Sequence, residues 1–315
     1  MFLNKEEDKK SFGVMFHHFH DENKHVRCQG SIDATKLEAI INWLNEKYVL
    51  LSAKDYLKRV EENTLEPHMK CLTFDDGLRC QYDVALPVLN RHKLTAFWFV
   101  YSSPFVNDAE TDRLEIYHNF RFSMFKDIDD FYGSFFDMLK RTKWYELLEI
   151  DREIREFSIQ KYRPDCSFYT MEDRLFRYLR NCVLKEHYHS LMDEMMMAYK
   201  YDIDNAKKSL WIEAESINSL AKSGHIIGLH THTHHTNLTS LSYEMQKKEW
   251  VKNKEIIENM TNKEVVTASY PCGVFNEETI RIMKENKIIL AFADNMLDDN
   301  SYGNLSMNRI DNTYL

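Results

Sequence analysis

The sequence lacks the features of several large protein classes. No run approaches the eighteen consecutive apolar residues of a membrane-spanning helix. No Lys/Arg-dense stretch carries interleaved aromatic residues, and 50 acidic against 41 basic residues give a net charge of −9, so nucleic acid is not an expected partner. Residues 1–10 contain no apolar core of the length that a secretory signal requires. We therefore expect a cytoplasmic protein without a transmembrane segment, with the inner membrane face as an alternative place of action.

The six cysteines also lack any C-x-x-C pair. Without an export signal, their even number is weak support for disulfides, and we expect them to be reduced. Cys71 lies inside the apolar run Met69–Phe74, where we expect a small buried hydrophobic side chain rather than a nucleophile.

Short apolar runs alternate with segments of helical periodicity. The chain has 315 residues and 43% apolar content, enough for one domain with an insertion. The alternation favours a largely parallel sheet with covering helices, either doubly wound or closed into a barrel. The predicted strands are Phe12–Phe16, Met69–Phe74, Thr95–Tyr101, His225–His230, Val265–Tyr270 and Ile288–Ala293. The predicted helices start near Asp33 and Ser52 and span Arg79–His92, Glu213–Lys222, Ser242–Met260 and Asn276–Asn286.

Residues 104–210 interrupt this alternation with long helical segments rich in aromatic residues and methionines. We predict that residues 1–103 and 211–315 form the two parts of one domain, and that 104–210 is a helical insertion. Its apolar residues are expected to form a small core, among them Phe120, Phe122, Phe125, Phe131, Phe135, Phe136, Met195, Met196 and Met197. The insertion is also a candidate lid or substrate wall, and both interpretations can hold together.

Two strings carry the candidate chemistry, and each follows a predicted strand. The first is Thr73–Gly77, sequence TFDDG, and the second is His230–His234, sequence HTHTH. In parallel α/β folds, reactive groups gather where strands reach their carboxyl ends. One carboxylate and two imidazoles suffice for an open divalent-metal site. Because consecutive residues of an extended segment point to opposite sides, one aspartate could bind the metal while its neighbour acts as a base.

Each string also has a simpler interpretation. Asp-Asp-Gly alone is a common turn after a strand. The histidines could be ordinary loop residues or a tag-like surface tract, although they follow a buried strand rather than a terminus. We expect His232 and His235 to support the ligands or face solvent rather than to bind metal.

These strings resemble the first two motifs of the polysaccharide deacetylase family, the NodB-like carbohydrate esterases. The resemblance implies that Asp75 is the catalytic base and Asp76 a metal ligand. It likewise implies that His230 and His234 are the other two ligands, and Thr231 is similar to the Ser/Thr that steadies their loop. The resemblance covers roughly residues 70–102 and 211–293.

The third motif is less specific and departs from the family pattern. Tyr270, Pro271 and Cys272 resemble the segment that lines the site, where the Cys272 N–H would face the oxyanion. Where many members carry an arginine that orients the base, this chain has Ser269. The resemblance therefore implies that this contact is missing or comes from elsewhere.

The acid that protonates the leaving amine is the other departure. No Leu-x-His string follows Leu290. The segment Phe16–His18 instead resembles a branch of the family whose N-terminal strand supplies the acid, and Asn308–Ile310 resembles the closing strand of that branch. We predict His17 as the acid and His18 as the alternative, since only one can face inward. The simpler interpretation is that both are ordinary strand histidines.

The resemblance implies a distorted (β/α) barrel of about seven strands with an inserted, mostly helical subdomain. The implied activity is metal-dependent N-deacetylation of an amino sugar in a glycan or glycan precursor of the cell surface. The implied cofactor is one divalent metal, Zn²⁺ first, with Co²⁺ or Ni²⁺ as alternatives, and the partner is an N-acetylated sugar. Two alternatives stay open: a hydrolase of another amide on the same scaffold, and a non-catalytic sugar-binding protein.

Overall fold

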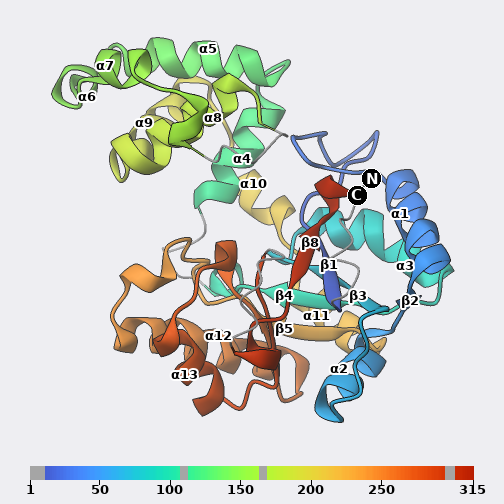
Figure 1. Ribbon diagram of the computed structural model, residues 1–315. Coiled ribbons are helices and arrows are strands. Elements are labelled where there is room, and N and C mark those ends of the chain that lie inside the picture. The colour runs from blue at the N-terminus through green and yellow to red at the C-terminus, as the bar shows by residue number, and fades with distance from the viewer. Residues whose placement is uncertain (1–10, 107–112, 163–168, 295–301) are drawn as a thin grey trace. The chain divides into compact units, whose positions relative to one another are not determined.

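The computed structural model describes residues 11–106, 113–162, 169–294 and 302–315. It divides into two compact units (Figure 1). The first contains Met1–Asp112 and Lys207–Leu315, and the second contains Arg113–Ala206. Among the described residues, no helix is long and apolar enough to cross a membrane.

The first unit is a nearly closed parallel barrel. Among the described residues, seven strands follow one another in the order β7-β6-β5-β4-β3-β1-β8, while β2 pairs with β3 beside this path. The two ends of the path approach each other, because Phe292 of β7 forms a parallel bridge with Met307, just before β8. This confirms the predicted distorted (β/α) barrel. The strands are β1 (Phe12–Phe16), β2 (Val49–Leu50), β3 (Met69–Phe74), β4 (Phe97–Val100), β5 (Ile226–Leu229), β6 (Thr267–Ser269), β7 (Leu290–Phe292) and β8 (Arg309–Asp311).

The barrel strands are largely buried on both sides because one side faces the interior and the other meets the covering helices. Every residue of β1 and β3 is buried. The helices begin at side-chain caps: Asp33 accepts from the Lys36 N–H before α1, and Ser242 accepts from the Met245 N–H before α12. The helices of this unit are α1 (Ala34–Lys47), α2 (Ala53–Glu61), α3 (Leu86–Arg91), α11 (Ala214–Lys222), α12 (Tyr243–Thr261) and α13 (Glu277–Glu285).

An aromatic cluster occupies part of the barrel core and includes Phe97, Phe99 and Phe292. Gly228 of β5 makes room for it, because a Cβ atom at this position would lie 2.5 Å from the ring of Phe99. Cys71 belongs to the same cluster and is fully buried, and burial raises the pKa of its thiol. The five cysteines within the described residues form no disulfide with one another, and Cys166 lies outside the described residues.

The second unit is helical and has its own aromatic core. Phe120, Phe131 and Phe135 are fully buried, as is Met195, whereas Met197 is 75% exposed. The buried Arg121 guanidinium lies 5.8 Å from the ring centre of Phe131. The insertion limits at 104 and 210 and the role of a lid stay predictions. The helices are α4 (Arg113–Ser123), α5 (Ile128–Leu139), α6 (Lys143–Leu147), α7 (Ile150–Arg155), α8 (Met171–Tyr178) and α9 (His187–Ala198), and α10 (Ile203–Leu210) leads back to the barrel.

Candidate metal and catalytic site

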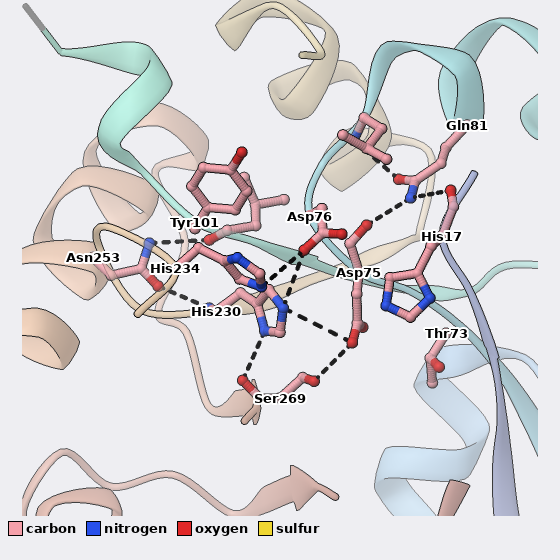
Figure 2. A network of polar contacts seen from close by, with 12 residues as sticks. His17, Thr73, Asp75, Asp76, Gln81, Tyr101, His230, His234, Asn253 and Ser269 are labelled. Atoms are coloured by element: carbon pink, nitrogen blue, oxygen red, sulfur yellow. Dashed lines mark hydrogen bonds and ion pairs between the residues drawn. The ribbon is translucent and has the colours of Figure 1, made fainter. Parts of the chain in front are cut away.

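The two chemical strings meet at one edge of the barrel. Asp75 and Asp76 directly follow β3, and His230 directly follows β5. Because all strands of the barrel are parallel, their carboxyl ends lie at the same edge. Figure 2 shows the side chains of these residues directed toward one another.

Asp76, His230 and His234 form a group of three donor atoms within 4.8 Å of one another. Asp76 Oδ1 lies 3.3 Å from Nε2 of His230 and 3.3 Å from Nε2 of His234. This oxygen is buried and, among the described residues, no donor meets it in hydrogen-bond geometry. Buried carboxylate oxygens normally have a partner, so the atom fits a cation held between the three side chains. One oxygen and two imidazole nitrogens are a donor set suited to Zn²⁺ with coordination positions left open.

The ring orientation of His230 is fixed from behind. Its Nδ1 hydrogen-bonds to the carbonyl oxygen of Ser269 at 2.8 Å, an acceptor that requires the proton on Nδ1. The Nε2 atom is then left with its lone pair on the side of Asp76. The backbone N–H of His230 donates to Asn253 Oδ1 at 2.9 Å, and Asn253 Nδ2 donates to the carbonyl of Val100 at 3.0 Å. Helix α12 therefore holds this ligand candidate against β4.

Asp75 has different partners from Asp76. Its Oδ1 accepts from Arg309 Nη1 at 2.7 Å, and its Oδ2 accepts from the Ser269 hydroxyl at 3.0 Å. Burial opposes ionisation of Asp75, but the Arg309 guanidinium and His230 more than offset it, and the pKa of this carboxyl lies below its usual value. Burial also opposes ionisation of Asp76, and the imidazoles of His234 and His230 bring its pKa far below the usual range. Both carboxyls are thus ionised at neutral pH.

The chain turns sharply at Asp76 and Gly77, and both residues have left-handed backbone. Asp76 has φ of 75° and Gly77 has φ of 63°, and left-handed backbone at a residue with a side chain is typical of functional sites. Gln81 supports the turn from inside. Its Nε2 donates to the carbonyl of Asp75 at 2.6 Å and to the carbonyl of His17 at 2.9 Å. Gln81 lies at the start of the π-helix Gln81–Ala85 and is fully buried.

The histidine loop is anchored through its backbone. Thr231 and His234 have φ of 62° and 56°. Glu249 Oε2 accepts from the N–H of His232 at 3.0 Å and from the N–H of Thr233 at 2.8 Å. His232 is buried, and its Nδ1 lies 2.8 Å from the hydroxyl of Ser102. His232 therefore braces the loop and is not a member of the donor group formed by Asp76, His230 and His234.

His17 lies on the other side of Asp75. Figure 2 shows its ring on the side of Asp75 away from His230 and His234. Its Nδ1 is 3.8 Å from Asp311 Oδ2, and its side chain is 32% exposed. The other carboxylate oxygen of Asp311 accepts from the N–H of Thr313 at 2.8 Å, so that carboxylate is held in place. The backbone carbonyl of His18 pairs with the N–H of Ile32.

The segment of the third motif, residues 270–272, forms a tight turn after β6. Cys272 has φ of 53° and an exposed side chain. Tyr270 and Pro271 are buried, and the Tyr270 hydroxyl donates to the carbonyl of Leu305 at 2.8 Å. Tyr270 therefore holds the turn from below. The roles of Cys272, Tyr270 and Pro271 toward substrate stay predictions.

Several supporting residues carry no sequence motif that would identify them. Gln81, Asn253 and Glu249 each hold two backbone groups at or beside the site by hydrogen bonds that no local sequence pattern indicates. Arg309 lies in the segment that resembles a closing strand, but nothing in its sequence context indicates contact with Asp75, 234 residues away.

Comparison with known proteins gives a consistent assignment. The model of the family described as polysaccharide deacetylase matches residues 62–119 and 170–290. A search of curated proteins finds no match. Three similar solved structures are a Streptococcus pyogenes deacetylase, PplD, in complex with acetate (15% identity, TM-score 0.55, 96% of this chain and 92% of that chain); IcaB from Ammonifex degensii (12%, 0.54, 96% and 91%); and a de-N-acetylase from Aggregatibacter actinomycetemcomitans (14%, 0.53, 96% and 95%).

At these identities the structural likeness shows the fold. The family model goes further, because it matches more than half of the chain in sequence, including both strings that meet at the barrel edge. The chain belongs to the polysaccharide deacetylase family.

Proposed function

We propose that the protein is a metal-dependent N-deacetylase that removes the acetyl group from an amino sugar of a glycan or glycan precursor. One observation carries the proposal: Asp75 is held by Arg309 and Ser269, next to but outside the donor group of Asp76, His230 and His234. The site thus offers a candidate base and a candidate metal site separately. The family description supports an acetylated carbohydrate as substrate.

Asp76, His230 and His234 would hold the cation. We expect Zn²⁺ because it favours mixed nitrogen and oxygen donors, with Co²⁺ or Ni²⁺ as alternatives. When bound, the cation supplies Lewis-acid polarisation of the acetyl carbonyl. The hydrogen bond from His230 Nδ1 to the Ser269 carbonyl leaves Nε2 available to bind the cation.

Asp75 is the proposed general base. It is ionised, and its Oδ2 lies 3.9 Å from Nε2 of His230, so it faces the donor group. In the proposed reaction Asp75 takes a proton from water, and the water oxygen forms a bond to the acetyl carbon. The N–H of Cys272 would stabilise the negative charge on the acetyl oxygen.

His17 is the proposed general acid. Its ring lies across Asp75 from the donor group, and Asp311 lies beside its Nδ1. A proton from His17 would reach the sugar nitrogen as the C–N bond breaks, which makes the amine a better leaving group. The products are acetate and a free amino sugar.

The direct test is acetate release by the purified full chain. Zinc-loaded protein should release acetate from oligomers of N-acetylglucosamine or from another N-acetylated amino sugar in a panel. Protein stripped with a chelator should lose this activity and regain it with added Zn²⁺. Acetate release that is unaffected by complete metal removal would contradict the proposed metal dependence.

Two other functions are tested alongside, because Ser269 stands where the third motif is expected to carry an arginine. A hydrolase of other amides would cleave formyl or cyclic amides in preference to acetylated sugars. A non-catalytic sugar-binding protein would hold zinc yet release no acetate from any N-acetyl sugar. The intact surroundings of Asp75 favour the deacetylase.

A role in surface-glycan assembly is part of the proposal, and the family description supports a polysaccharide as the substrate class. Analysis of N-acetylation in the surface glycans of the native cell after deletion of the gene would test this role. Unchanged acetylation of every surface glycan would rule out this role.

A further inference from the structure

We propose that Arg309, on the last strand of the barrel, is the positioning residue for the base Asp75. The Ser269 hydroxyl supports it by bridging the guanidinium and the second carboxylate oxygen. The inference deepens the proposed deacetylase function and rests on it. It also explains how the site keeps an oriented base although the third motif carries a serine where a charged side chain is expected.

The contacts form a closed ring around the Asp75 carboxylate. Arg309 Nη1 donates to Asp75 Oδ1 at 2.7 Å. Arg309 Nη2 donates to the Ser269 hydroxyl at 2.7 Å, and that hydroxyl donates to Asp75 Oδ2 at 3.0 Å. The arrangement is a bidentate arginine–carboxylate pair with one branch lengthened by a hydroxyl group. Because both carboxylate oxygens accept a hydrogen bond, the plane of the carboxylate is fixed.

The guanidinium is itself immobilised. Its Nε donates to the carbonyl of Ala293 at 2.6 Å, and its Nη1 also reaches the Thr73 hydroxyl at 3.4 Å. The guanidinium carbon, Cζ, lies 5.9 Å from the ring centre of Phe99 and 5.8 Å from that of Phe292. The side chain is 0% exposed. A planar, permanently charged group held on several sides can orient a carboxylate more strictly than a flexible ammonium could.

Glycine at position 13 of β1 allows close packing of the residues around this side chain. Gly13 pairs with Arg309, and a Cβ atom at Gly13 would lie 3.1 Å from Thr73 Cγ2 and 3.2 Å from the Phe292 ring, with Arg309 Cγ at 3.4 Å. Both Thr73 and Phe292 are neighbours of the guanidinium. The charge thus comes from β8, and the bridging serine comes from the end of β6.

Ser269 also connects the base to the donor group. Its side chain donates to Asp75, while its backbone carbonyl receives the hydrogen bond from His230 Nδ1. A single residue thus fixes the separation between the proposed base and one proposed ligand. The ring contacts Asp75 and leaves Asp76 untouched, so its loss should affect turnover far more than metal binding.

Three variants test the role. Arg309→Lys keeps the charge but cannot donate from two nitrogens at once, Arg309→Gln loses the charge, and Ser269→Ala removes only the bridging hydroxyl. Matched controls are Arg121→Lys, a buried arginine of the second unit, and Ser306→Ala, a buried serine outside the ring. Values of kcat are expressed per bound zinc, so that misfolded protein does not count. We expect kcat to fall about 10-fold or more in Ser269→Ala and further in both Arg309 variants, with KM and zinc content within about twofold, since a general base contributes about 10²–10⁴-fold.

Crystal structures of Ser269→Ala and Arg309→Lys give a readout independent of activity. We expect the Asp75 carboxylate to rotate or shift while Asp76, His230 and His234 keep their places. If wild-type protein is active and all three variants keep kcat within twofold, the role of Arg309 is overturned and the deacetylase function stands. If wild-type protein releases no acetate, the proposed function fails, and an unmoved Asp75 in these crystals would then also refute the positioning role. If the Arg309 variants do not fold, kcat and the position of the Asp75 carboxylate in Ser269→Ala test the proposal, and wild-type values of both would overturn it.

Discussion

Asp75 and Asp76 are neighbours in the chain but belong to different parts of the site. Asp75 accepts hydrogen bonds from Arg309 and Ser269, whereas Asp76 directs a buried oxygen at the imidazoles of His230 and His234. The left-handed backbone at Asp76 makes this divergence stable by turning the chain between the two carboxylates. Two identical side chains can therefore take different chemical roles.

His17 is expected to act only on substrates whose leaving group needs a proton. His17→Ala should lower kcat for an N-acetyl sugar by about 10²-fold, because a general acid contributes on this scale. Hydrolysis of 4-nitrophenyl acetate should be nearly unchanged, since nitrophenolate departs without protonation. His18→Ala serves as the matched control, and an equal loss on both substrates, or a larger effect from His18→Ala, would contradict the assignment.

Gln81 is expected to contribute to turnover as well as to stability. Gln81→Leu removes the donor that joins the carbonyls of Asp75 and His17, and each buried carbonyl left without its partner costs about 1–3 kcal/mol. The control is Gln246→Leu, which breaks comparable buried contacts with Leu241 and Thr279 outside the site. Urea unfolding should show similar losses of stability in the two variants, and kcat per bound zinc should fall only for Gln81→Leu. A similar kcat in both variants would show that Gln81 is only structural.

Two glycines should respond to alanine with opposite signs. Gly228→Ala would place a Cβ atom 2.5 Å from the Phe99 ring and 2.6 Å from Thr267 Oγ1, and such overpacking costs about 1–3 kcal/mol of the free energy of unfolding. Gly133 lies inside α5 with nothing within 4 Å of the added atom. Gly133→Ala should therefore stabilise the protein by about 0.5–1 kcal/mol through helix propensity. Chemical denaturation of both variants checks the difference in sign.

His225 should make stability fall in mild acid. Its Nδ1 accepts the Ala96 N–H at 3.1 Å and the Trp98 indole N–H at 3.1 Å, and burial lowers its pKa to about 4 from 6.5. Between pH 6.5 and 4 the unfolded chain binds this proton and the folded chain does not. The free energy of unfolding should therefore fall as pH drops through 6.5, by about 2 kcal/mol between pH 7 and pH 5 from this group. Urea titrations of wild type and His225→Gln would measure it; an equal pH dependence of the two proteins would refute the role of His225.

The sequence predicts the parts of the molecule that depend on local pattern. Short, mostly apolar runs between helical segments locate the barrel strands, as at Met69–Phe74, and the aspartates and histidines of the candidate metal site directly follow such strands. Strand β2 has only two residues, too few to show a period. The ring of Asp75, Ser269 and Arg309 joins residues 194 and 234 positions apart, so the closure of the barrel, rather than any local pattern, brings them together.

The most direct test compares two aspartate variants in one experiment that measures bound zinc and released acetate on the same samples. Asp75→Asn should keep one zinc per chain and lose about 10²–10⁴-fold in turnover, because the base is removed while the donor group is intact. Asp76→Ala should lose its zinc, because two imidazoles alone hold the ion weakly. Wild-type zinc content in Asp76→Ala, or near-normal turnover in Asp75→Asn, would contradict the division of roles between the two carboxylates.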